Sequence, residues 1–305
     1  MTSVEQALGP LFLLILTGAL LGWARLPGGD FWSRLEGLIY HLLFPAMLVA
    51  TLATAEVGAV PVVRLAIVLL GAMLIFALLL WRCRAWLSLG LPAFTSAFQG
   101  ALRFNTYVGV AGAAALHGSA GATVAAVAVA LMVPVVNVLC VAAFIAAGTL
   151  GPSSLGKSLV ALARNPLILA CLAGITLNLT GIGLPGWSEA AVGLLGRAAL
   201  PLGLVAVGVA LRPQALLRLS RGVWAATAVK LALMPALVLG LALLLGLPPV
   251  SRDVALLFAA LPTATSAYIL ARQLGGDAEL MAALITAQTL LAMLTLPLWL
   301  GLVLS

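Results

Sequence analysis

The stretch Pro166-Leu-Ile-Leu-Ala-Cys-Leu-Ala-Gly174 decides the fold, because it repeats the pattern of Pro10-Leu-Phe-Leu-Leu-Ile-Leu-Thr-Gly18. The two stretches match at Pro, at three Leu and at Gly, and each position lies 156 residues after its counterpart. The same spacing relates Pro45 to Pro201. Apolar composition alone explains shared leucines, but aligned prolines and glycines indicate a duplicated chain.

The composition places almost the whole chain in a membrane. Of its 305 residues, 64% are hydrophobic and 8% are charged, and the mean hydropathy is +1.24. Ordinary globular chains carry about 25% charged residues, so a soluble enzyme, a secreted module and a disordered chain are excluded. The net charge of +7 is typical of basic cytoplasmic loops and does not indicate nucleic-acid binding. The three cysteines form no CxxC pair, so the sequence predicts neither a metal site nor a cofactor.

Breaks at charges, Gly and Pro divide the chain into ten expected helices, each long enough for a membrane span of about 20 residues. Their ranges are 7–23, 35–54, 62–81, 94–116, 120–147, 166–184, 190–211, 223–245, 254–270 and 280–304. Eight or eleven helices are the alternatives. Five helices per repeat is an odd number, so the second copy would insert upside down, as in secondary transporters. We therefore predict an all-α polytopic membrane protein with repeats over 1–147 and 166–305 and a short cytoplasmic linker over 148–165.

Basic residues in the expected loops predict the orientation. With the N-terminus outside, ten of them fall in cytoplasmic connections: Arg25, Arg34, Arg82, Arg84, Lys157, Arg164, Arg212, Arg218, Arg221 and Arg272. Only Arg64 and Arg252 would then lie outside. This bias favours an orientation with both termini outside the cytoplasm.

Two stretches rich in Gly, Pro and small polar residues predict broken helices. The fourth expected helix holds RFNTYVGVAG over 103–112, and the ninth holds ALPTATSAY over 260–268. Each is fourth in its repeat, and Asn105 corresponds to Leu261, next to Pro262. An interrupted helix frees backbone groups that are costly in lipid, and transporters place substrate sites there. The alternative is that Pro and Gly are common in membrane helices and that Ser and Thr bond back to i−4 carbonyls.

The expected substrate contacts come from these two stretches. They are Asn105, Thr106, Tyr107, Gly109, Pro262, Thr263, Thr265, Ser266 and Tyr268. The N-terminal ends of half-helices carry partial positive charge and unpaired N–H groups, which favours a carboxylate. Asn137 and Gln288 are further polar groups at membrane depth, for which hydrogen bonds between helices are the alternative role.

The charged residues indicate an anionic substrate. All eight acids lie in loops or at expected helix ends, so no cation site of buried carboxylates is visible. Arg103, Arg197 and Lys230 lie in apolar segments without an acidic partner, and ionisable residues there are costly and mark transport pathways. The alternatives are snorkelling for Arg103, bonds to carbonyls freed by Pro201 for Arg197, and interaction with the broken helices for Lys230.

His41 is the group in the middle of the second helix that titrates near neutral pH, so it is a candidate for a coupled proton. A hydrogen bond to a backbone carbonyl near Pro45 is the alternative role. The coupling ion, H⁺ or Na⁺, stays open. HExxH, GxSxG and paired midspan carboxylates are missing from the sequence, so the chain is not expected to be an enzyme.

Five stretches of the chain carry a family resemblance. They are NTYVGVAG over 105–112, LPTATSAYILARQLGGD over 261–277, LAMLTLPLWL over 291–300, VKLALMPAL over 229–237 and ALPLGLVAVGVAL over 199–211. Through these five stretches the chain resembles the auxin efflux carrier family of membrane transporters. The resemblance implies ten helices in two inverted repeats, similar to sodium/proton antiporters, with the fourth and ninth helices crossing at broken centres. It also implies a scaffold of helices 1, 2, 6 and 7, moving helices 3–5 and 8–10, and a homodimer through helices 2 and 7.

That family includes plant auxin exporters and bacterial permeases assigned to malonate and malate. The resemblance thus implies a secondary carrier of a small organic anion, a carboxylate, in the bacterial inner membrane, with elevator-type alternating access. The alternative is a sodium- or proton-coupled carrier of another solute, similar to bile-acid transporters. The family's fourth helix commonly has a proline where this chain has Ala111. A break there would depend on Gly109, Gly112 and Asn105 instead.

Overall fold

The computed structural model describes residues 3–55, 58, 60–148, 160, 164–218 and 220–304, and this part of the chain is helical throughout with short connections. The expected linker over 148–165, including Lys157, lies almost entirely outside the described residues. The first half contains α1 (Ser3–Trp23), α2 (Phe31–Leu38), a π-helical turn (Ile39–Leu43), α3 (Phe44–Ala53), α4 (Val62–Arg82), α5 (Arg84–Leu87), α6 (Leu91–Leu102) and α7 (Thr106–Ala146). The second half contains α9 (Pro166–Leu179), α10 (Gly186–Val209), a 3-10 turn (Pro213–Arg218), α11 (Arg221–Ala228), a second π-helical turn (Val229–Leu233), α12 (Met234–Leu244), α13 (Pro249–Ala260), α14 (Ser266–Gln273) and α15 (Ala278–Leu304).

Seven stretches of the described chain are long and apolar enough to cross a membrane. One of them, Leu91–Ala146, has 56 residues and contains both a break after Leu102 and a reversal at Gly118, where φ is 59° and ψ is −139°. The reversal lies in the turn that HGSAG over 117–121 predicts, so this one stretch holds the expected fourth and fifth helices. The protein is therefore a polytopic helical membrane protein, and the count of ten spans stays a prediction.

Both π-helical turns come directly before a proline in the helix that follows. Pro45 follows the turn that contains His41, and Pro235 follows the turn that contains Lys230. Proline lacks an N–H, and its ring clashes with the carbonyl four residues earlier, so an extra residue in the turn relieves the clash. The two turns place their ionisable residues differently: His41 is exposed, whereas Lys230 is buried.

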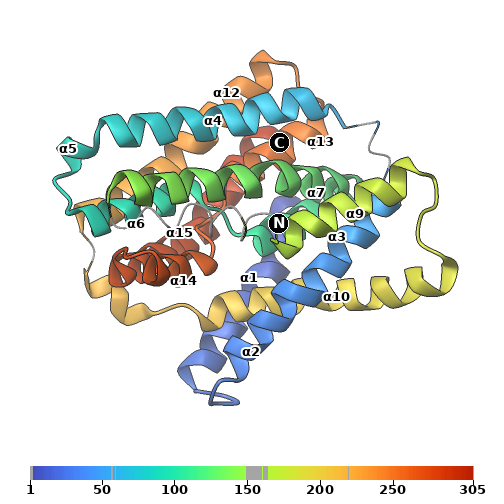
Figure 1. Ribbon diagram of the computed structural model, residues 1–305, viewed down its shortest axis with the longest axis horizontal. Coiled ribbons are helices and arrows are strands. Elements are labelled where there is room, and N and C mark those ends of the chain that lie inside the picture. Colours follow the sequence, from blue (N-terminus) through green and yellow to red (C-terminus); the bar gives the residue numbers. More distant parts are fainter. Residues whose placement is uncertain are drawn as a thin grey trace.

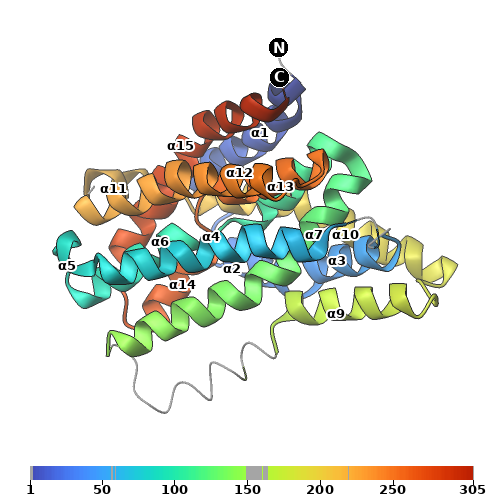
Figure 2. The same ribbon diagram turned by 90° about the horizontal axis from the view of Figure 1, so that it is seen from above.

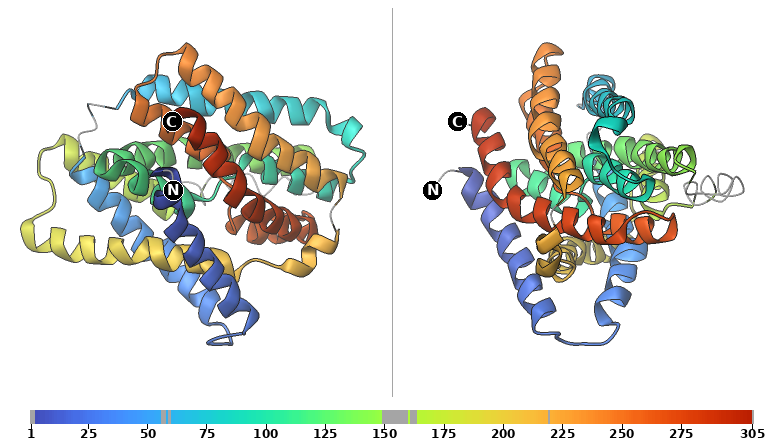
Figure 3. Two further views of the ribbon diagram at one scale, coloured as in Figure 1. Left: turned by 180° about the vertical axis from the view of Figure 1, so that it is seen from behind. Right: turned by 90° about the vertical axis from the view of Figure 1, so that its left-hand side faces the viewer.

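The helices pack in two groups that meet along α7. In the first group α1 packs along α10, and α3 packs on both α9 and α10 (Figure 1). In the second group α13 packs on α7, α12 and α15, and α6 packs on α11 and α15. Figure 2 shows the start of α1 and the end of α15 on the same side of the molecule. The turn between α1 and α2 protrudes from the bundle (Figure 3).

Two close contacts within the first group join corresponding positions of the predicted repeats. A Cβ atom on Gly18 in α1 would lie 2.0 Å from the Val205 carbonyl oxygen in α10. A Cβ atom on Gly174 in α9 would lie 3.3 Å from the Val49 carbonyl oxygen in α3. Gly174 and Val205 lie 156 residues after Gly18 and Val49, respectively. The same kind of glycine contact thus joins α1 to α10 and α9 to α3.

The contact between α1 and α10 leads to a stability prediction for Gly208. A Cβ atom on Gly208 would lie 1.9 Å from the Ile15 carbonyl oxygen, so even one methyl group would force the two backbones apart. Small residues allow membrane helices to pack this closely, and overpacking costs about 1–3 kcal/mol or more. We expect Gly208→Ala to lower the unfolding free energy by about 3 kcal/mol, measured by thermal unfolding in detergent.

Gly9→Ala is the matched control, because no atom lies within 4 Å of a Cβ built on Gly9 of α1. We expect this variant to unfold at the wild-type temperature. Equal unfolding temperatures for Gly208→Ala and Gly9→Ala would contradict the close contact.

Candidate functional site

Two helix breaks meet in the interior of the protein, and we call their meeting place the crossing. The first break, over 103–105, separates α6 from α7, and the second, over 261–265, separates α13 from α14. Arg103 and Leu261 have extended backbone conformations with ψ values of 153° and 146°. The Asn105 N–H donates a hydrogen bond of 2.8 Å to the Pro262 carbonyl oxygen. Both stretches that the sequence singled out are therefore interrupted, and the interruptions touch.

The first break forms without a proline. Asn105 has a ψ of 101° and its side-chain oxygen accepts a hydrogen bond of 3.3 Å from the Val108 N–H, which caps the start of α7. Asn is among the residues preferred at this capping position. Ala111 is helical and buried within α7. The expectation that Gly109 and Gly112 would provide the break was wrong, because both glycines lie inside the helix that follows it.

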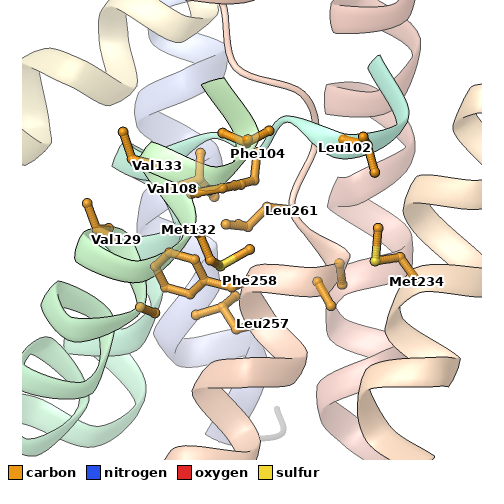
Figure 4. Close-up of a cluster of buried hydrophobic side chains, with 14 of the residues drawn as sticks. Leu102, Phe104, Val108, Val129, Met132, Val133, Met234, Leu257, Phe258 and Leu261 are labelled. Atoms are coloured by element: carbon orange, nitrogen blue, oxygen red, sulfur yellow. The ribbon is translucent and has the colours of Figure 1, made fainter. Parts of the chain in front are cut away.

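Gly109 and Gly112 instead let α7 approach α13 closely. A Cβ atom on Gly109 would lie 2.7 Å from a Leu261 methyl carbon, and one on Gly112 would lie 3.1 Å from Leu257. Figure 4 shows Leu261, Phe258 and Leu257 beside Val108 at this contact. Small residues on α7 thus determine how close the two breaks lie.

Gln288 of α15 joins the two breaks through hydrogen bonds. Its Oε1 accepts from the Thr263 N–H at 2.9 Å and from the Thr263 hydroxyl at 2.8 Å, and its Nε2 donates to the Gly100 carbonyl oxygen at 3.0 Å. The Thr263 hydroxyl also lies 2.6 Å from the Gly100 carbonyl oxygen. A broken helix must satisfy its freed backbone groups inside a membrane. Gln288 thus bonds one freed backbone group of each break, the Gly100 carbonyl oxygen and the Thr263 N–H, so it is part of the crossing.

Several buried polar side-chain atoms near the crossing have no hydrogen-bond partner among the described residues. They include Asn105 Nδ2, both side-chain heteroatoms of Gln99, Ser96 Oγ and Thr289 Oγ1. Such groups cost free energy, and a bound water, ion or ligand is one way in which they are satisfied. Gln99 and Ser96 were not predicted, although they precede the first break by one to two helical turns. Asn105 Nδ2 and Arg103 Nε are donors within the break itself that have no partner in the described part of the chain.

Lys230 lies beside the C-terminal ends of two half-helices. Its Nζ atom lies 5.9 Å from the centre of the Phe104 ring, and it lines a small apolar cavity with Leu102 at the end of α6 and Ala259 near the end of α13. Helix C-termini carry partial negative charge, which a buried cation offsets. This position favours an interaction with the broken helices over direct contact with an anion, because the side chain is only 1% exposed.

Arg103 has a side-chain partner in the structure. Its Nη2 donates to the Asn137 side-chain oxygen on α7, while its Nε is buried without a partner. Asn137 therefore binds the Arg103 side chain, which lies half-buried next to the crossing. The structure thus brings two sequence candidates together, one from the break and one from a neighbouring helix segment.

Glu36 and Tyr40 form a polar cluster near the crossing that was not predicted. The Glu36 carboxylate lies near the Thr265 hydroxyl in the second break, and Tyr40 lies near Asn165 and Arg103. Both residues belong to the α2–α3 segment and are half-buried. Glu36 lies at the start of the expected second helix, 35–54, so its sequence position suggested a peripheral place.

Asp253 also differs from the expectation for the acids. It is 1% exposed in α13, its Oδ1 accepts a hydrogen bond of 2.9 Å from the adjacent Arg252, and its Oδ2 lies 3.1 Å from His117 Nε2. Asp253 lies near the start of α13, as expected for the acids, but the expectation that no carboxylate is buried was wrong for it. The contact ties the turn at Gly118 to the start of α13.

A large cavity, which we call the vestibule, lies between α3 and α10 on one side and α7 and α13 on the other. Its volume is about 1090 Å³, and residues that line it include Met47, Thr51, Val110, Thr123, Glu189 and Arg197. Leu200 of α10 lines this cavity, and three residues later Gly203 packs against the Tyr107 ring, whose centre lies 5.0 Å from that of Phe44 in an edge-to-face arrangement. None of the residues that line the vestibule belongs to either break.

Four sequence candidates lie outside the contacts of the crossing. Tyr268 stacks under the Arg212 guanidinium, 4.6 Å away, and accepts a hydrogen bond of 3.2 Å from it. His41 is exposed, and its Nδ1 lies 2.9 Å from the Gly37 carbonyl oxygen, four residues earlier. Ser266 is exposed at the start of α14, and Thr106 is half-exposed at the start of α7.

Comparisons with known proteins point to membrane transport rather than to an enzyme. Residues 152–300 match the family described as membrane transport protein. Over 136 residues the chain is 34% identical to a protein of Rhizobium meliloti (strain 1021) that is provisionally named as a malonate transporter. This match covers 44% of the chain and 42% of the relative, so it spans less than half the length of either protein.

Proposed function

We propose that this chain, a membrane transporter of the auxin efflux carrier family, moves a small organic anion with one or more carboxylates across the bacterial inner membrane. The contact between the two breaks supports this function most directly. There the Asn105 N–H bonds the Pro262 carbonyl, and the buried Asn105 Nδ2 donor has no partner in the part of the chain that the structure describes. A carboxylate would accept from this donor and from the first N–H groups of α7 and α14, which carry partial positive charge.

The charges around the crossing support an anion over a cation. Lys230 lies beside the C-terminal ends of α6 and α13, and Arg103 is a basic group at the first break. Glu36 is the acid near the second break, where it lies against Thr265. A negative substrate would complete the pairing of these charges, since an unpaired ionisable group in a membrane is costly.

Alternating access would occur between the two groups of helices. The proposed scaffold contains α1, α2, α3, α9 and α10, and the proposed moving unit contains α4–α7 and α11–α15. The corresponding contacts at Gly18 with Val205 and at Gly174 with Val49 support two inverted repeats of five spans, ten in all. An elevator-type movement of the second group, both termini outside the cytoplasm, and a homodimer through α2–α3 and α10 complete the proposal.

Uptake by purified protein in liposomes tests the function. We expect saturable uptake of radiolabelled malonate or of a related small carboxylate, with competition among carboxylates and no uptake of organic cations of similar size. Imposed gradients of Na⁺ and of H⁺, applied separately, identify the coupling ion. A folded protein that moves no carboxylate from a broad panel would contradict the proposed function, and Na⁺-dependent uptake of a neutral solute without carboxylate competition would favour the alternative carrier.

A further inference from the structure

Arg197 is the basic side chain among the residues that line the vestibule. It projects from α10, is exposed to the cavity, and forms no ion pair or hydrogen bond with another described residue. Glu189 lines the same cavity eight residues earlier, or about 12 Å along the helix, since a helix rises about 1.5 Å per residue. The vestibule therefore has a negative group near one end of its α10 wall and a positive group near the other end.

Hydroxyl groups complete a polar lining around Arg197. Thr51 of α3, Thr123 of α7 and Ser251 of α13 also face the vestibule, and they come from both groups of helices. A cavity of about 1090 Å³ is larger than a small carboxylate needs, because pockets for drug-sized ligands measure about 300–1,000 Å³. Arginine is suited to carboxylates because its guanidinium can donate two parallel hydrogen bonds.

The vestibule is separate from the crossing in this structure. Gly203 of α10 packs against the Tyr107 ring, and Arg197 lies six residues before Gly203, or about 9 Å along α10. Phe44 packs edge-to-face on Tyr107 from α3, and neither ring is among the residues that line the vestibule, whereas Tyr107 comes two residues after Asn105 of the first break. An anion at Arg197 would therefore occupy a different place from an anion at Asn105.

We infer that Arg197 in the vestibule forms a first binding site for a small organic carboxylate, occupied before the substrate reaches the crossing. This site rests on the proposed function. Because exposed charges act over long distances, Arg197 would attract anions and Glu189 would oppose them. The two residues therefore have opposite expected effects on the concentration of substrate needed for transport.

Initial rates of carboxylate uptake in liposomes of neutral lipid test this site. We expect Arg197→Gln to raise the KM about tenfold while kcat stays within twofold, and Arg197→Lys to restore most of the wild-type KM. Glu189→Gln should lower the KM about twofold. Raising the ionic strength should raise the wild-type KM and should affect Arg197→Gln less, because salt screens exposed charges.

Arg272→Gln is the matched control, because it changes the net charge equally at an exposed residue outside the vestibule. We expect it to leave the KM unchanged. An unchanged KM in Arg197→Gln, or an equal change in both variants, would overturn the site while leaving carboxylate transport in place. If Arg197 binds a lipid phosphate, its substitution should alter only the dependence of uptake on added anionic lipid, and this result would also overturn the site. Complete lack of carboxylate uptake by the wild type would instead overturn the proposed function, and the site with it.

Discussion

Replacing Asn105 with Asp should abolish carboxylate transport while the protein stays folded. The Asn105 Oδ1 caps α7 by accepting from the Val108 N–H, and an aspartate oxygen can accept the same bond. The Nδ2 donor, which is buried without a partner, would become an acceptor with negative charge. We expect uptake to fall at least a hundredfold, because an anion would lose a donor and face a like charge.

The unfolding temperature of Asn105→Asp separates the effect on binding from the effect on folding. We expect it to lie only slightly below the wild-type value, because the positive end of α7 offsets much of the cost of burying a carboxylate at a residue that is 1% exposed. Asn105→Ala removes the cap as well as the donor, so it should lose both transport and about 1 kcal/mol of stability. Wild-type carboxylate uptake by a folded Asn105→Asp protein would show that the crossing does not bind the anion.

Replacing Gln288 with Leu should destabilise the protein more than most substitutions of a single side chain. The Thr263 N–H would lose its partner, whereas the Gly100 carbonyl oxygen would lose the bond from Gln288 but keep the one from the Thr263 hydroxyl. A buried polar group left without a partner costs about 1–3 kcal/mol and a lost hydrogen bond about 1 kcal/mol, so we expect a loss of roughly 2–4 kcal/mol. Thermal unfolding in detergent measures this loss, and transport should be lost with it because the two breaks would no longer be held together.

Gln99→Leu provides the matched control for this prediction. Gln99 and Gln288 are both 0% exposed, but the Gln99 side chain has no hydrogen-bond partner among the described residues. Exchanging an unpaired buried amide for an apolar group of similar size should be nearly neutral or stabilising. A loss of stability in Gln99→Leu as large as that in Gln288→Leu would show that the hydrogen bonds at the crossing are not the cause.

The location of the crossing was predictable from the sequence because Gly, Pro and small polar residues are concentrated at two related positions. Pro262 identifies the second break directly, since proline removes a backbone donor. The first break was harder to place. Asn105 was named as a candidate, but its role as the cap of α7 depends on a backbone conformation that the residue type alone does not specify.

Contacts between distant segments could not be predicted from a single sequence. Gln288 lies 25 residues after Thr263 and 188 residues after Gly100, yet it joins both breaks. Glu36 and Asp253 lie near expected helix ends, so no buried carboxylate was expected from them, but packing by other helices buries Asp253 and half-buries Glu36. Similarly, Lys230 and His41 both lie in π-helical turns, but only tertiary packing determines which of them is buried.

The most direct test of anion binding at the crossing compares the thermal unfolding of the wild type with that of Asn105→Asp, each in the presence of carboxylates. A ligand that binds only the folded state stabilises it by about 2.7 kcal/mol at a hundred times its Kd. With mono- and dicarboxylates, at two pH values and with or without Na⁺, we expect at least one carboxylate to raise the unfolding temperature of the wild type and to leave that of Asn105→Asp unchanged. Equal carboxylate shifts in the two proteins, or a shift that Na⁺ alone produces, would contradict an anion site where the two broken helices meet.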